Sequence, residues 1–150
     1  MAKTIFFLHV LSAAVWLGGS IYVEALLAGA GRTGRAQDFV RTVAAAATTG
    51  ARLFPVAAVG TLVFGFWLVF VTAWEFESIW VTGGFVLGLA TVALSVAFLK
   101  PKGDALAGLV ADQGADHPDA VALARRIQNA SHAVTGLLFL AFLLMVYKPA

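Results

Sequence analysis

Long stretches without charged side chains alternate along the chain with short segments that hold nearly all of the charges. A helix needs roughly 20 apolar residues to cross the hydrocarbon layer of a bilayer, which is about 30 Å thick. Four stretches lack Asp, Glu, Lys and Arg over at least that length: residues 4–23, 53–74, 78–99 and 127–147. The pattern therefore predicts four transmembrane helices, with approximate spans 4–26, 53–74, 78–99 and 127–147.

These stretches differ from the strands of a membrane β-barrel, which alternate apolar and polar residues over about ten positions. Residues 64–71, for example, show no such alternation. Since hydrocarbon offers no hydrogen-bond partner to backbone groups, a span outside a barrel must be helical. We therefore predict an all-α fold, an integral membrane four-helix bundle that forms one transmembrane domain over residues 1–150.

Composition narrows the class of protein further. Hydrophobic residues make up 61% of the 150 positions and charged residues 12%, about half the charged share of a soluble domain. A soluble globule would leave much of this apolar surface in water, and a chain without Cys is not a disulfide scaffold. A cleaved signal peptide is the alternative for the first stretch, but its apolar core would be only about 7–15 residues long.

Basic residues indicate how the helices are oriented, because Lys and Arg collect in cytoplasmic loops. Eight of the ten lie between the first and second spans or between the third and fourth, and the other two are Lys3 and Lys148 near the chain ends. We therefore predict that segments 29–51 and 100–126 are cytoplasmic and that both termini lie outside, in a bacterial inner (plasma) membrane. The expected partner is the lipid bilayer and not a nucleic acid, because no basic face with base-reading or stacking groups is visible.

The connecting segments contain signals that begin and end helices. Helix breaks are predicted at the glycine-rich run 29–35, at 101–103 and at Gly114. Between these breaks we expect a helix over 36–51 that runs into the second span, and a short helix near 104–112. A proline at the first helical position predicts a last helix from Pro118 to Tyr147, capped by Asp116 or His117.

Polar side chains form a stripe along one face of the first span. His9, Trp16 and Ser20 fall within about 40° of each other, with Ser12 and Glu24 at the edges of the stripe. Because polar groups are costly in hydrocarbon, this face is expected to point into the bundle. A histidine there either hydrogen-bonds a neighbouring helix or binds a metal or a haem, since histidine is the commonest metal ligand and an axial haem ligand.

The fourth span carries a second polar face, centred on His132. The residues within about 60° of His132 on the helix are Arg125, Gln128, Asn129, Thr135 and Gly136. This face can likewise serve helix packing, or it can mark a functional site within the membrane.

Helical rise indicates which of these residues can meet. The level of His9 is close to that of Met145, whereas His132 lies roughly 16 Å deeper, so the two histidines are not expected to share one haem. His9 and Met145 can instead form a haem or copper site. Glu24 can pair with Arg125 or His132, as a buried ion pair or a proton-handling site.

Short motifs in the chain resemble known membrane families. Leu8-His9-Val10-Leu11, followed by Val15-Trp16-Leu17-Gly18-Gly19, is similar to the opening helix of bacterial copper-resistance-D-like membrane proteins. The ending Leu144-Met145-Val146-Tyr147-Lys148-Pro149 resembles that of a related uncharacterised family of predicted four-helix integral membrane proteins. The first helix is also similar to that of a haem-dependent protoporphyrinogen oxidase family.

The resemblance implies copper handling at the inner membrane, or haem binding with His9 as an axial ligand. With the two polar faces, it marks His9, Trp16, Gly19 and His132 as candidate cofactor-binding residues, with haem b as the cofactor. His9 and Met145 are the candidate metal ligands, with copper as the metal.

We therefore predict a small integral membrane protein that binds b-type haem or a metal ion through His9, in electron transfer or metal homeostasis. One alternative is a non-catalytic subunit that packs in a larger membrane complex or with copies of itself. Another is a transporter or proton channel that uses Glu24 and His132. No nucleophile arrangement, phosphate-binding loop or pair of carboxylates within a span is present, so the sequence favours a protein that is not an enzyme and assigns no catalytic residue.

The predicted orientation can be measured by cysteine labelling, because the chain has no Cys of its own. In spheroplasts, a membrane-impermeant maleimide should label an Ala2→Cys variant directly. An Asp116→Cys variant should react only after the membrane is opened, because segment 100–126 is expected in the cytoplasm. The reverse pattern would contradict the orientation, and labelling of both variants in closed spheroplasts would contradict four spans.

Overall fold

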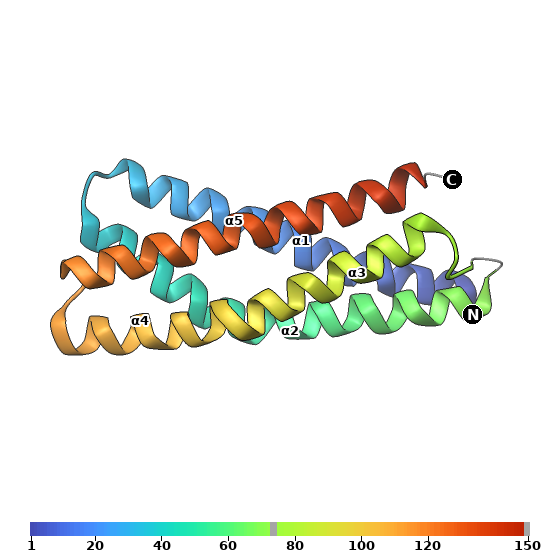
Figure 1. Ribbon diagram of the computed structural model, residues 1–150, viewed down its shortest axis with the longest axis horizontal. Coiled ribbons are helices and arrows are strands. Elements are labelled where there is room, and N and C mark those ends of the chain that lie inside the picture. Colours follow the sequence, from blue (N-terminus) through green and yellow to red (C-terminus); the bar gives the residue numbers. More distant parts are fainter. Residues whose placement is uncertain (73–74, 149–150) are drawn as a thin grey trace.

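The computed structural model describes residues 1–72 and 75–148 as an elongated bundle of long helices (Figure 1). In chain order the elements are α1 (Ala2–Arg32), α2 (Ala36–Val71), α3 (Ile79–Leu94), the π-helical turn η1 (Ser95–Leu99), α4 (Lys100–Gln113) and α5 (Pro118–Tyr147). Four helices are long and apolar enough to cross a membrane, with Ile79–Gln113 counted as one of them. The predicted all-α four-helix membrane fold is confirmed, while residues 73–74 of the predicted second span lie outside the described part of the chain.

The first connection is tighter than the sequence predicts. The break expected over residues 29–35 is confined to residues 33–35, because α1 continues through Gly29 and Gly31 to Arg32. Gly34 has a φ of +71°, which is accessible to glycine without steric cost. The Thr33 hydroxyl donates to the carbonyl of Ala30 at 2.9 Å, so the end of α1 is closed locally.

The predicted break at 101–103 is absent, and the chain passes from α3 to α4 through the π-helical turn η1. Pro101 has no N–H, and its ring crowds the carbonyl four residues earlier, at Ala97. A wider π-helical turn at Ser95–Leu99 accommodates this proline without ending the helix. Gly103 also stays helical: it is buried, and a Cβ built there would lie 2.9 Å from the Cβ of Ala47 in α2.

The remaining helix ends follow the sequence signals. Gly114 ends α4 with a φ of +92°, a conformation that favours glycine. Helix α5 runs over Pro118–Tyr147, and the side chain of its N-cap residue, His117, accepts a hydrogen bond from the backbone N–H of Asp119. Helix α2 is continuous from Ala36 to Val71 and includes Pro55 within it.

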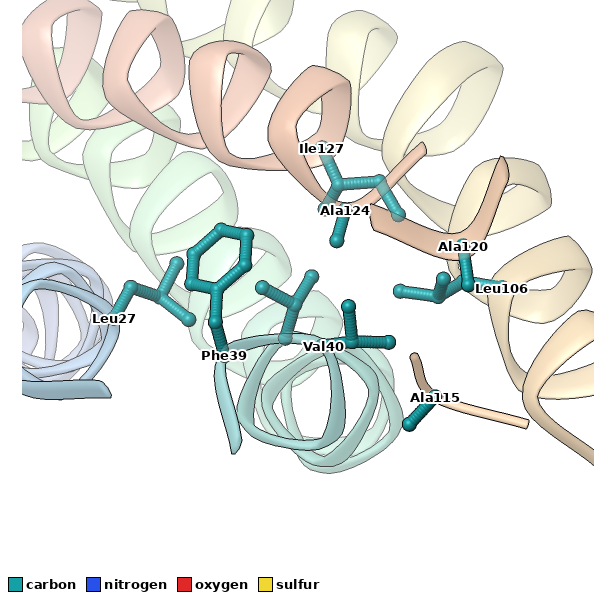
Figure 2. Packing of buried hydrophobic residues seen from close by; sticks show 9 residues of the cluster. Leu27, Phe39, Val40, Leu106, Ala115, Ala120, Ala124 and Ile127 are labelled. Carbon is teal, nitrogen blue, oxygen red and sulfur yellow. The ribbon is translucent and has the colours of Figure 1, made fainter. Parts of the chain in front are cut away.

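The bundle consists of two closely packed helix pairs, because the most extensive contacts join α1 to α2 and α3 to α5. One core cluster joins α1, α2, α4 and α5 near the two connections at 33–35 and 114–117; its labelled members are Leu27, Phe39, Val40, Leu106, Ala115, Ala120, Ala124 and Ile127 (Figure 2). A second cluster surrounds Trp16 in the middle of the bundle. Many large apolar side chains along the spans are exposed on the outside of the helices, as expected for a surface that contacts lipid.

Both chain ends lie at the same end of the bundle, together with the turn around residues 75–78 (Figure 1). The turns at 33–35 and 114–117 lie at the opposite end, which we call the basic end because eight of the ten Lys and Arg residues lie in or beside the two segments that meet there. An even number of spans accounts for this arrangement.

Candidate functional site

His9 packs against α2, where it forms a hydrogen bond and fits into the space beside a glycine. Its Nδ1 lies 2.9 Å from the backbone carbonyl oxygen of Thr61. The ring fits there because residue 65 has no side chain: a Cβ built on Gly65 would lie 3.0 Å from His9 Cε1 and 3.1 Å from Nδ1. The orientation of the imidazole is therefore determined by two positions one helical turn apart on the neighbouring helix.

The hydrogen bond to Thr61 determines where the imidazole carries its proton. A carbonyl oxygen can only accept, so His9 Nδ1 must donate. In the neutral ring, Nε2 then carries a lone pair, and it has no hydrogen-bond partner among the described residues. Histidines that bind metals show this arrangement, in which one ring nitrogen donates to a backbone carbonyl while the other is the ligand.

His9 lines a cavity of about 320 Å³ that lies between the two helix pairs. Its walls are almost entirely apolar and come from α1, α2, α3 and α5. Met145 lines the same cavity, and its thioether packs against Gly84 of α3. The structure thus brings His9 and Met145 to one cavity.

The lining of this cavity also includes a contact between a cation and an aromatic ring. Lys148 and Trp80 both line it, and Lys148 Nζ lies 5.1 Å from the centroid of the Trp80 ring. Such a cation–π contact holds the ammonium group over the ring face. Phe6, Val10 and Phe142 also line the cavity and are about half exposed, which shows that it opens toward the lipid.

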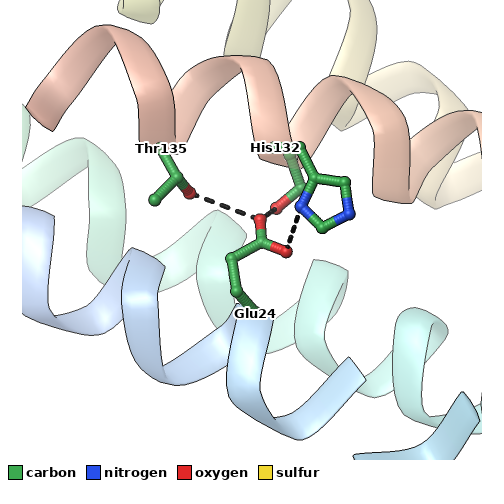
Figure 3. A network of polar contacts seen from close by, with 4 residues as sticks. Glu24, His132 and Thr135 are labelled. Carbon is green, nitrogen blue, oxygen red and sulfur yellow. Dashed lines mark hydrogen bonds and ion pairs between the residues drawn. The ribbon is translucent and has the colours of Figure 1, made fainter. Parts of the chain in front are cut away.

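Glu24 forms a second polar cluster, between α1 and α5 (Figure 3). Its Oε1 accepts hydrogen bonds from the hydroxyls of Ser131 at 2.7 Å and Thr135 at 3.3 Å. Its Oε2 lies 2.7 Å from His132 Nδ1. Oε2 is buried and accepts no hydrogen bond within the described part of the chain, so the approach of His132 Nδ1 is its one close polar contact there.

The two sides of this ion pair differ in exposure. The Glu24 side chain is 16% exposed and the His132 side chain 56%. A carboxylate that is largely removed from solvent requires a positive charge or several hydrogen-bond donors nearby. The Glu24 carboxylate has two hydroxyl donors and one neighbouring imidazole, and this imidazole is more exposed than the carboxylate.

The polar residues predicted from the sequence thus fall into separate sites. His132 contacts Glu24, which follows His9 by 15 positions in α1, or roughly 22 Å of helical rise. Arg125 makes no ion pair with Glu24 and lines a different groove. Trp16 is buried in a packing cluster and also lines the His9 cavity, whereas Gly19 packs against the ring of Phe54.

Sequence reasoning missed the residues that complete both sites. Thr61 and Gly65 position His9, and Ser131 donates to Glu24. The sequence does contain a signal for Ser131, because it lies four residues from Thr135 and therefore on the same face of α5. No equivalent signal marks Thr61, because the group that contacts His9 is a backbone carbonyl.

The fold and the four apolar spans define a multi-pass integral membrane protein. The family described as a predicted integral membrane protein (DUF2269) matches residues 3–149, so the chain belongs to this family. No curated protein matches the chain. No solved structure matches it either.

A double-mutant cycle measures the contact between Glu24 and His132. Glu24→Gln and His132→Gln should each lower the free energy of unfolding, and their effects should be coupled by about 1–2 kcal/mol, because the side chains share one network. The measurement is unfolding of the purified protein by SDS in mixed micelles. The pair Glu24→Gln and His9→Gln is the control and should be additive within about 0.5 kcal/mol. Additivity in the first cycle would show that the ion pair contributes nothing to stability.

Proposed function

We propose that this protein binds a b-type haem in the membrane, with His9 as an axial ligand, and that it serves in electron transfer or metal homeostasis. The observation that carries the proposal is the geometry of His9. Its Nδ1 donates to the Thr61 carbonyl, so Nε2 is available to a ligand in an apolar cavity that Met145 also lines. We also propose, from the distribution of Lys and Arg, that the chain resides in a bacterial inner membrane with its termini outside.

The ligand count favours haem over a bare metal ion. Among the described residues there is no group of three or more His, Cys, Asp or Glu side chains that could hold a metal ion. Zinc sites use three or four protein ligands, whereas the porphyrin supplies four nitrogens and needs only axial ligands from the protein. His9 and Met145 supply one nitrogen and one thioether, which is a known axial pair for haem iron. Copper held by the same two side chains is the alternative.

The surroundings of His9 suit a mostly apolar group that the cavity encloses in part. A volume of about 320 Å³ is at the lower end for ligand pockets, and the opening between exposed apolar side chains allows such a group to extend toward the lipid. Lys148 and Trp80 also line the cavity and contact each other there. The rest of the lining excludes water from the ligand.

A bound haem supplies one-electron chemistry whose potential depends on its axial ligands and its burial. The chain has three tasks in this proposal. His9 would hold the haem iron, Thr61 orients the imidazole by accepting from Nδ1, and Gly65 leaves room for the ring.

The absorption spectrum of the purified protein tests the proposal. Protein produced with an adequate haem supply should show a Soret band and contain iron, and His9→Ala should lose most of the haem because the nitrogen ligand is gone. His132→Ala is the matched control and should retain the band, because His132 lies at the other polar cluster. Protein that contains neither haem nor a metal would contradict the proposal, and copper without haem would favour the copper alternative.

Two glycine variants distinguish an effect on the position of the His9 ring from a general effect on the stability of the protein. Gly65→Ala should shift the Soret band or lower haem occupancy, because a Cβ there would overlap the His9 ring. Gly18→Ala makes the same chemical change in a helix where nothing lies within 4 Å of the added atom, and its spectrum should be unchanged. Equal effects of the two variants would argue against the assigned role of Gly65.

The contact between Glu24 and His132 supports a second candidate function, proton transport. A carboxylate and an imidazole 2.7 Å apart can exchange a proton, and more than half of the His132 side chain is exposed.

In proteoliposomes with an internal pH dye, proton flux should then fall at least tenfold in Glu24→Gln and stay unchanged in Glu77→Gln, whose carboxylate is exposed in the turn before α3. Absence of flux in the unmodified protein would remove this function. A non-catalytic role in a larger complex would then remain if the protein also lacked haem.

A further inference from the structure

The basic end of the bundle holds a second cavity, which neither function above uses. It is a groove of about 620 Å³ between the end of α1, the start of α2 and the first half of α5. Its polar lining consists of two arginines, Arg35 and Arg125, and two amides, Gln128 and Asn129. No acidic side chain is among its lining residues in the described part of the chain.

The two arginines are available to a ligand. Arg35 directly precedes α2 and Arg125 lies in α5. Both are exposed, and neither forms an ion pair within the described residues. Guanidinium groups offer several N–H donors in a planar array that matches the oxygens of a phosphate. The amides of Gln128 and Asn129 add further N–H donors beside them.

The start of α2 adds backbone donors to the groove. Arg35 is the N-cap residue of α2, and no side chain caps this end. Asp38 N–H and Phe39 N–H donate to the Arg35 carbonyl, which leaves the N–H groups of Ala36 and Gln37 without a partner in the described residues. The N-terminus of a helix carries a partial positive charge that favours anions.

The depth of the groove matches the headgroup region of a bilayer. The charge-free stretch of α5, residues 127–147, is about 31 Å long as a helix, close to the thickness of the hydrocarbon layer. Arg125 lies just beyond this stretch, and Gln128 and Asn129 lie at its edge. Leu27 and Ala28 of α1 add apolar lining to the same groove.

We propose that this groove binds the phosphate group of an anionic phospholipid at the basic end of the protein. A free phosphate has the same oxygens, but the depth of Arg125 along α5 places the groove at the level where lipid phosphates are concentrated. Basic pockets between transmembrane helices bind anionic headgroups in this way. The inference does not depend on haem binding, because the His9 cavity lies in the half of the bundle near the chain ends.

Native mass spectrometry of the delipidated protein in detergent tests this site. Phosphatidylglycerol should bind more tightly than zwitterionic phosphatidylcholine. The double variant Arg35→Gln/Arg125→Gln should bind phosphatidylglycerol about 25-fold more weakly, since each basic contact contributes about fivefold. The matched control Arg41→Gln/Arg126→Gln removes the same charge from exposed arginines outside the groove. It should change binding less than about threefold, because neither of these side chains lines the groove.

A conservative variant controls for loss of folding, and a soluble competitor distinguishes a lipid from a free phosphate. Arg35→Lys/Arg125→Lys retains both charges but loses the planar donor array, so binding should fall to an intermediate level even if the glutamine variant is unstable. Inorganic phosphate in large excess should not displace the lipid. Displacement by inorganic phosphate, equal binding of the two lipids, or equal losses in the variant and its control would each overturn the proposal.

Discussion

The fold depends on one constraint: within a bilayer, a polar group must find its hydrogen-bond partner inside the protein. Several hydroxyl groups satisfy this constraint within their own helix, because each donates to the carbonyl four residues earlier. These are the hydroxyls of Ser20, Thr61, Thr91 and Ser95. Imidazole and carboxylate groups reach beyond their own helix. His9 and Glu24 therefore find their partners on α2 and α5, and these contacts tie α1 to both neighbours.

Small residues determine how closely the helices approach at these contacts. Gly65 admits the His9 ring, Gly84 admits the Met145 thioether, and Gly103 lets α4 pack against α2. Lipid is as apolar as the helix surfaces, so close packing rather than exclusion of water drives helix association in a membrane. The His9 cavity forms where two tightly packed helix pairs meet less closely, and its remaining lining is apolar.

Much of the fold could be predicted from the sequence, because hydrocarbon thickness constrains the length of each span. The start of α5 at Pro118 and the end of α4 at Gly114 follow from local backbone chemistry. The predicted break at 29–35 is confirmed only over residues 33–35, because glycine lowers helix stability by only about 1 kcal/mol and α1 continues through Gly29 and Gly31. The predicted break at 101–103 was wrong. A π-helical turn accommodates Pro101, and packing against Ala47 keeps Gly103 helical.

The sequence by itself determined the class of protein, the number of spans and the set of polar residues within them, because each depends on composition along a single helix. Only the tertiary structure decided which of these residues meet. It placed His132 and not Arg125 beside Glu24, and it put His9 against a backbone carbonyl that has no sequence signature. The physical reason is that depth along a helix follows from residue number, whereas the neighbour across the bundle depends on how the helices rotate and pair.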